Sequence, residues 1–221
     1  MIEEKINWDA LVFALNTWRQ GLDAPSVTVI AEKYRHDPWA ILVSTILSLR
    51  TKDEVTLTAS AALLEKAPSP ETLLCLKETE IEKLIFPAGF YKTKTKNLRE
   101  IAKILIEKYK SIPPADMDAL LELPGVGRKT ANLVLIEAFD RDGICVDTHV
   151  HRISNRTGWV KTKTPEETEM ALRTILPVLY WKALNPLLVL YGQNICRPVS
   201  PFCSKCTIAF CCMKAGVEKT R

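Results

Sequence analysis

Apolar residues recur at helical spacing along most of this chain. Near the N-terminus, one such face comprises Ala10, Leu11, Ala14, Leu15 and Trp18. Spacings of three and four residues are typical of amphipathic helices. The longest apolar run, Trp39 to Leu49, predicts a buried core helix because it is too short for a membrane span of about 20 residues. No segment alternates like a strand, so we predict an all-α fold of two helical lobes.

Short polar signals mark where some of these helices begin. Ser69 precedes Pro70, which predicts a serine N-cap followed by a proline at the first helical position. The spacing of a capping box occurs twice more, in Thr79 with Glu82 and in Thr164 with Glu167.

A glycine-rich turn separates two helical segments in the middle of the chain. Asp116 is placed to cap a short helix, and a second helical pattern follows the turn P-G-V-G at residues 124–127. Both glycines of this turn can take the positive φ that a tight reversal needs. The second helix would present its N-terminal N–H groups to an anion such as a DNA phosphate. The expected contacts come from Gly125, Val126, Gly127 and Arg128.

Two residues near this turn are candidates for chemistry. Lys129 lies in the first helical turn after the glycines, where the helix N-terminus disfavours an ammonium and favours the nucleophilic amine. A neutral lysine of this kind can form a Schiff base. Asp147 stands just before another helical pattern. The simpler interpretations are that Lys129 is a solvated lysine and that Asp147 is an N-cap.

The charge of the chain permits a nucleic-acid partner and is unevenly distributed. The 221 residues carry a net charge of +4. A lysine-rich stripe runs through Lys92, Lys94, Lys96, Arg99, Lys103, Lys108 and Lys110. Such a stripe is often only a solvated helix face, but beside a phosphate-binding turn we interpret it as facing DNA. Residues 1–20 lack the apolar core of a signal peptide, so we expect an intracellular monomer without a membrane partner.

Four of the seven cysteines form one constellation. Cys196, Cys203, Cys206 and Cys212 have the spacing C-x6-C-x2-C-x5-C. Disulfides are disfavoured in an intracellular protein. On chemistry alone, four thiolates suit either a tetrahedral zinc ion or an iron–sulfur cluster.

Taken together, these motifs resemble the endonuclease III family of helix-hairpin-helix DNA glycosylases. The resemblance rests on L-P-G-V-G-R-K-T-A-N at residues 123–132, V-D-T-H-V-x-R at residues 146–152, and the cysteine spacing. It implies that Lys129 and Asp147 are the catalytic pair and that the four cysteines hold a 4Fe-4S cluster. It further implies a six-helix lobe at residues 31–141, a second lobe from residues 1–30 and 142–221, and a DNA-binding cleft between the lobes.

The implied activity is base excision repair. A bifunctional glycosylase and AP lyase would remove a damaged, oxidised pyrimidine from double-stranded DNA and nick the strand at the resulting abasic site. Two alternatives stay open. A mismatch uracil or thymine glycosylase would keep Asp147 and tolerate loss of Lys129, and a non-enzymatic helix-hairpin-helix module would need neither residue.

The sequence departs from the bacterial family pattern at two positions expected to contact DNA. Arg50 stands where the family commonly has glutamine, and Phe90, followed by Tyr91 and Lys92, stands where it has a leucine wedge. Arg50 could read the orphaned base, with guanine as its best match. Alternatively, it pairs with Asp53, Glu54 or a phosphate and reads nothing.

Overall fold

The prediction of an all-α fold is confirmed. The computed structural model describes residues 6–221 and contains no strand within that range. Residues 1–5, which belong to the N-terminal segment without a signal-peptide core, lie outside the described residues. The α-helices are α1 (Trp8–Trp18), α2 (Ser26–Lys33), α3 (Pro38–Ser48), α4 (Asp53–Lys66), α5 (Pro70–Cys75), α6 (Glu78–Ile85), α7 (Tyr91–Tyr109), α8 (Met117–Leu121), α9 (Arg128–Phe139), α10 (Thr148–Thr157), α11 (Pro165–Ile175) and α12 (Trp181–Asn194).

The chain divides into two compact units. One is Pro25–Gly143, and the other joins the residues up to Ala24 with Ile144–Arg221. The first unit holds six helices of eight residues or more, together with the short helices α5 and α8. Its N-terminal limit lies before residue 31 because α2 packs on α3 and α4.

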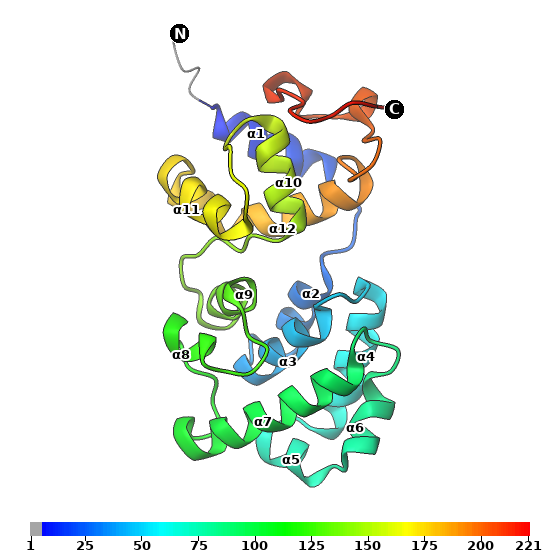
Figure 1. The fold of residues 1–221 in the computed structure, drawn as a ribbon, viewed down its shortest axis with the longest axis vertical. Helices are drawn as coiled ribbons and strands as arrows, with labels where there is room; N and C mark the ends of the chain where they lie inside the picture. Colours follow the sequence, from blue (N-terminus) through cyan, green and yellow to red (C-terminus); the bar gives the residue numbers. More distant parts are fainter. Residues whose placement is uncertain (1–5) are drawn as a thin grey trace. The chain divides into compact units, whose positions relative to one another are not determined.

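Helix α3 forms the centre of the unit Pro25–Gly143, where it packs on α2, α4, α7 and α9 (Figure 1). Asp37 caps it by accepting from Ala40 N at 2.8 Å, and every side chain from Trp39 to Leu47 is buried. Ser44 and Thr45 are tolerated inside because both hydroxyls donate to Ile41 O, at 3.0 and 2.7 Å. The run is therefore a core helix, as predicted. No helix within residues 6–221 is long and apolar enough to cross a membrane.

The C-terminal end of α3 is closed by a buried lysine. Lys94, on α7, is only 5% exposed, and its Nζ donates to Leu47 O at 2.8 Å, Leu49 O at 2.7 Å and Thr51 Oγ1 at 2.9 Å. Burial lowers the pKa of Lys94 to about 8, whereas the helix-end carbonyls favour its charged form. The interpretation of Lys94 as a DNA-facing lysine was therefore wrong.

The other unit is built on α1, α10, α11 and α12. Leu11 and Leu15 of α1 are fully buried in a core that includes Val150 and Ile153 of α10 and Leu188 of α12. Trp8 stacks edge-on against Trp159 at 5.2 Å and donates Nε1 to Ile175 O at 3.0 Å. The amphipathic face predicted for residues 10–18 thus anchors the N-terminal helix to the C-terminal segment.

Two of the three predicted helix starts are confirmed. Ser69 caps α5 with Pro70 at its start, and Thr164 caps α11 by accepting from Glu167 N at 3.2 Å. The other half of that capping box differs from the prediction, because Glu167 Oε2 accepts from Lys163 N at 2.7 Å rather than from Thr164 N. The capping box predicted for Thr79 and Glu82 is wrong. Helix α6 begins two residues earlier than predicted, at Glu78, and Glu80 accepts from the backbone N–H of Lys77 at 2.7 Å, so Lys77 takes the cap position.

The buried Lys94 predicts a specific dependence of stability on pH. Its folded-state pKa of about 8 lies below the usual 10.5, so between these values the unfolded chain binds more protons. The free energy of unfolding should therefore rise with pH across this window. Urea unfolding at several pH values in this range gives the free energy of unfolding of wild type and of Lys94→Met. As pH rises, this free energy should increase more for wild type than for the variant. A difference that shrinks as pH rises would contradict the assignment.

Candidate functional site

The glycine-rich turn joins α8 to α9 as a tight hairpin. Asp116 caps α8 by accepting from Ala119 N at 2.9 Å, as predicted. Gly125 has φ +79°, a conformation that favours glycine. Val126 anchors the turn, since it is only 7% exposed and its N–H donates to Leu123 O at 3.1 Å. These features form the predicted helix-hairpin-helix.

The backbone at Gly127 differs from that at Gly125. Gly127 is the N-cap of α9 with φ −104° and ψ 177°, which residues with side chains adopt readily, so Gly127 does not use the positive φ that glycine permits. A Cβ added to Gly127 would meet nothing within 4 Å, whereas one on Gly125 would lie 2.4 Å from Asn97 Nδ2. The chain itself therefore does not require glycine at position 127. The absent side chain keeps the start of α9 open to close approach by a ligand.

Lys129 occupies the first turn of α9, where the sequence placed it, and is half-buried. Its neighbour Thr130 is only 1% exposed and anchors the same turn, while Arg128 is half-buried. Because the N-cap residue Gly127 has no side chain, no side-chain cap bonds the N–H groups of this turn. The structure thus places an amine beside an N-terminus that the cap residue leaves accessible, which is an arrangement suited to an anionic ligand.

Asp147 is the N-cap of α10 and belongs to the other unit. Its Oδ1 accepts from His149 N at 2.8 Å and from Val150 N at 2.9 Å. The simpler interpretation, that Asp147 caps a helix, is therefore correct. Both bonds end on Oδ1, so Oδ2 makes no hydrogen bond to the described residues. Capping consequently orients the carboxylate and leaves one of its oxygens for chemistry.

A buried amide holds the segment that leads to Asp147. Asn185 of α12 is 8% exposed and donates Nδ2 to Cys145 O at 3.0 Å, and Ile144, Cys145 and Val146 are buried. No local pattern indicates this contact, because an asparagine inside a helical pattern does not show which distant carbonyl it reaches.

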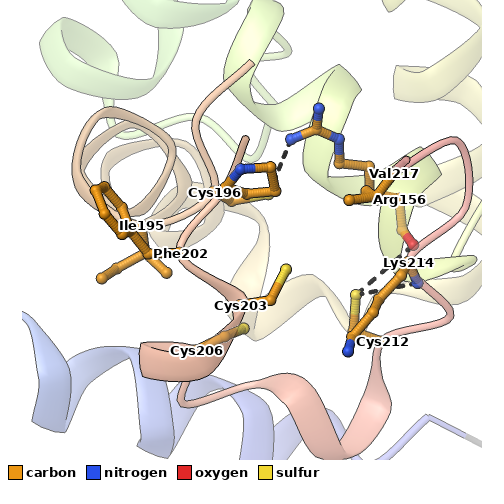
Figure 2. Close-up of a pocket in the computed structure, with 10 residues that line it drawn as sticks. Arg156, Ile195, Cys196, Phe202, Cys203, Cys206, Cys212, Lys214 and Val217 are labelled. Atoms are coloured by element: carbon orange, nitrogen blue, oxygen red, sulfur yellow. Dashed lines mark hydrogen bonds between the residues drawn. The ribbon is translucent and has the colours of Figure 1, made fainter. Parts of the chain in front are cut away.

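The four spaced cysteines line one pocket, which Figure 2 shows. Cys196, Cys203, Cys206 and Cys212 all contribute to its wall. Cys211 lies outside, packs against the core, and donates Sγ to Ile208 O at 3.4 Å. Within residues 6–221, no three His, Cys, Asp or Glu side chains gather closely enough to hold a single metal ion. The thiols instead surround a shared space.

Two arginines of α10 support the wall of this pocket. Arg156 donates to Cys196 Sγ at 3.5 Å and to Arg197 O at 2.6 Å, while Arg152 donates to Cys196 O at 2.8 Å. Burial, reinforced by the neighbouring thiols, raises the pKa of Cys203 and of Cys212. Four thiolates would therefore need a cationic partner that all of them share. The donor set and its surroundings fit an iron–sulfur cluster.

Arg50 and Phe90, the two departures from the family pattern, lie together. The Arg50 guanidinium sits 5.3 Å from the centre of the Phe90 ring, and the ring is 62% exposed. Asp53, one of the carboxylates considered for Arg50, accepts from Ser26 Oγ at 2.7 Å. A cation stacked on an exposed aromatic ring offers a flat, charged surface to a ligand.

Comparison with known proteins agrees with this geometry. Residues 43–177 match the model of the HhH-GPD superfamily base excision DNA repair proteins. The chain is 49% identical to endonuclease III of Thermotoga maritima over 170 residues, which are 77% of this chain and 80% of the relative. It therefore belongs to the endonuclease III family.

Solved structures of the endonuclease III family share this fold. A non-covalent endonuclease III–DNA complex is 30% identical, with a TM-score of 0.81 over 95% of this chain and 96% of that one. A trapped covalent endonuclease III–DNA intermediate is 34% identical, with a TM-score of 0.76 over 80% and 84%. The resemblance to the endonuclease III family extends across both units.

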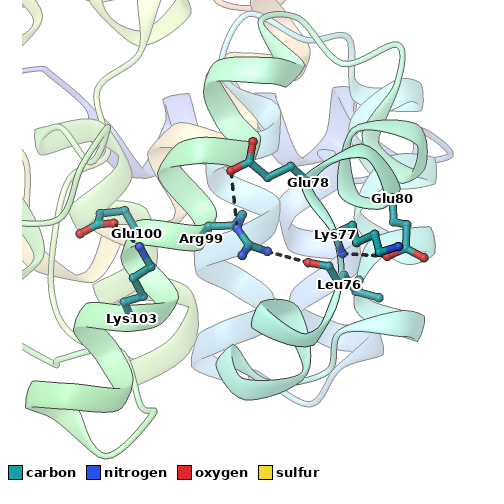
Figure 3. A network of polar contacts seen from close by, with 7 residues as sticks. All are labelled: Leu76, Lys77, Glu78, Glu80, Arg99, Glu100 and Lys103. Atoms are coloured by element: carbon teal, nitrogen blue, oxygen red, sulfur yellow. Dashed lines mark hydrogen bonds and ion pairs between the residues drawn. The ribbon is translucent and has the colours of Figure 1, made fainter.

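The lysine-rich stripe is smaller than the sequence suggested. Arg99 is half-buried, donates to Leu76 O at 2.6 Å and approaches Glu78 at 3.9 Å. Lys103 pairs with Glu100 at 3.2 Å, as Figure 3 shows. With Lys94 buried and Arg99 half-buried, the exposed stripe residues are Lys92, Lys96, Lys103, Lys108 and Lys110. Helical spacing turns Lys94 toward the end of α3 and Arg99 toward the segment between α5 and α6.

The two hairpin glycines should respond differently to alanine. Gly125→Ala forces a side chain into positive φ and toward Asn97, and should cost about 1–2 kcal/mol of unfolding free energy. Gly127→Ala should cost less than about 1 kcal/mol, because its φ is ordinary and the space beside it is open. Urea unfolding of both variants measures this contrast. Equal losses would contradict the assignment.

Proposed function

We propose that the protein is a base excision repair DNA glycosylase with AP lyase activity that removes oxidised pyrimidines. The observation that carries this proposal is Lys129 in the first turn of a helix whose N-cap glycine leaves the approach open. Membership of the endonuclease III family supports the same activity. The partner is double-stranded DNA, on which a monomer acts inside the cell.

The hairpin and the Arg50–Phe90 pair supply the proposed DNA contacts. The backbone of Gly125, Val126 and Gly127 would approach a phosphate closely, with Arg128 and Lys92 adding charge. Arg50 and Phe90 would enter the duplex where the damaged nucleotide is rotated out, a step that costs a few kcal/mol. A preference for guanine opposite the lesion stays a prediction from the hydrogen-bonding fork of Arg50.

The proposed reaction runs through an amine and a carboxylate. Lys129 Nζ attacks the sugar C1′, and the bond from C1′ to the damaged base breaks with the base as leaving group. Loss of a proton from the nitrogen and opening of the sugar ring give an imine. Abstraction of a proton from C2′ then expels the 3′ phosphate by β-elimination, which nicks the strand 3′ to the lesion.

Asp147 supports this reaction through a charge held in a fixed orientation. Its Oδ1 is committed to the two N–H groups at the start of α10. Oδ2 can then stabilise the positive charge that develops on the sugar, or assist proton transfer. The segment before Asp147 is pinned through Asn185, so the carboxylate does not reorganise during the reaction.

We propose that Cys196, Cys203, Cys206 and Cys212 hold a 4Fe-4S cluster. Their spacing resembles that of the family, and all four line one pocket. A cluster bound there would cross-link the segment after α12, which otherwise contains only the 3₁₀ turns Cys203–Lys205 and Ala209–Cys211. Its contribution to the reaction is structural, since it would fix this segment against α10.

The alternatives explain the residues less well. A mismatch uracil or thymine glycosylase would have no use for Lys129, and a non-enzymatic module would have no use for Lys129 or Asp147. The presence of both residues at the family's motif positions favours the lyase.

The catalytic pair is tested by two substitutions. Lys129→Gln should abolish borohydride trapping on an abasic duplex while leaving duplex binding largely intact, because the backbone of the hairpin is unchanged. Asp147→Asn keeps much of the capping ability but removes the charge. It should lower the rate of base excision about a hundredfold or more with little loss of stability.

Single-turnover nicking and urea unfolding measure these effects. Glu166→Gln, an acidic residue in the first turn of α11, is a suitable control because it removes one carboxylate from the same unit. Were Lys129→Gln to nick abasic DNA at the wild-type rate, the Schiff-base assignment would be wrong.

The cluster proposal predicts a specific metal content. Anaerobically purified protein should contain iron and acid-labile sulfide in about equal amounts, as in a cubane cluster. Serine at any of the four pocket cysteines should reduce soluble yield. Cys75→Ser should be mild because Cys75 is exposed and remote in sequence. One equivalent of zinc without iron would contradict the proposal.

A further inference from the structure

Lys94 lies beneath the Arg50–Phe90 pair and touches the backbone that carries both residues. Its Nζ donates to Leu47 O, Leu49 O and Thr51 Oγ1, at 2.8, 2.7 and 2.9 Å. Its own backbone N–H donates to Phe90 O at 3.0 Å. One buried residue thus contacts the segment on each side of Arg50 and the residue Phe90 itself.

The two segments also contact each other directly. Thr51 Oγ1 accepts from Gly89 N at 3.1 Å as well as from Lys94. A Cβ added to Gly89 would lie 2.3 Å from Arg50 O, so the two turns pack backbone against backbone. Thr51 Oγ1 therefore links the Arg50 turn, the Phe90 turn and the Lys94 ammonium.

Both turns are held in an uncommon conformation. Arg50 has φ +53° and Phe90 has φ +58°, and residues with bulky side chains rarely adopt positive φ unless their surroundings fix it. The contacts from Lys94 and Thr51 are such a constraint. They hold the guanidinium over the ring at 5.3 Å although both side chains are exposed.

We propose that Lys94 is a positioning residue for DNA recognition, and that it acts through Thr51 to hold Arg50 and Phe90 ready to enter the duplex. This inference rests on the proposed function, in which that pair contacts DNA. Lys94 need not touch DNA itself, since it is buried. Pre-organisation of this kind improves affinity because the turns need not be ordered during binding.

The test uses the Thr51 hydroxyl, which can be removed without a change of shape. Thr51→Val and Lys94→Met should weaken binding to a duplex containing a tetrahydrofuran abasic analogue by about tenfold. Thr51→Ser should restore binding because it keeps the acceptor. Nicking of a true abasic site at saturating DNA should change less than about twofold, since Lys129 lies in a separate hairpin. Thr58→Val and Lys66→Met, exposed positions on α4, are the matched controls.

A double-mutant cycle separates positioning from a general structural role. In the background Arg50→Ala with Phe90→Ala, Thr51→Val should have little further effect on binding, because no pair is left to position. An equal loss in both backgrounds would overturn the inference and make Thr51 and Lys94 merely structural. If the background alone weakens binding but Thr51→Val does not, only the positioning inference fails. If the background alone binds like wild type, the proposed DNA contact fails, and the inference fails with it.

Discussion

The backbone groups at helix ends, which have no partner in their own helix, constrain where this protein can place its reactive side chains. Three helix ends meet this constraint in three ways. Asp147 accepts two N–H groups at the start of α10, and Lys94 donates to two carbonyls at the end of α3. At the start of α9, Gly127 provides no side-chain cap. Of these three ends, the one that the cap residue leaves open carries Lys129.

Helix α10 connects Asp147 with the cysteine-lined pocket within one unit. Asp147 caps its first turn, and Arg152 and Arg156 extend from its later turns to Cys196 and the backbone that follows it. The segment after α12 holds only the 3₁₀ turns Cys203–Lys205 and Ala209–Cys211. Its conformation therefore depends on its own turn hydrogen bonds, on these arginines and on whatever the cysteines bind. Loss of that ligand would therefore disturb the support of α10 before it disturbed the core of the other unit.

Local sequence signals predicted much of this structure, whereas contacts between residues far apart in the sequence could not be predicted from them. Helical periodicity gave the core helix α3, and Asp116, Ser69 and Thr164 marked helix starts because a cap acts within three residues. The family motif located Lys129 and Asp147. Lys94 was misjudged because its acceptors are more than 40 residues away in the sequence, and Thr79 was misjudged because two cap positions compete closely. No local pattern indicates that Asn185 reaches Cys145 or that Arg50 stacks on Phe90.

The central claim is that the amine of Lys129 forms the covalent bond to DNA, and the most direct measurement is to locate that bond. Wild-type protein reduced with borohydride on an abasic duplex can be digested with nuclease and protease and analysed by mass spectrometry. We expect a single modified peptide, with the deoxyribose remnant on Lys129. A remnant on Lys94, on another lysine of α7, or on the N-terminal amine would contradict the assignment of Lys129.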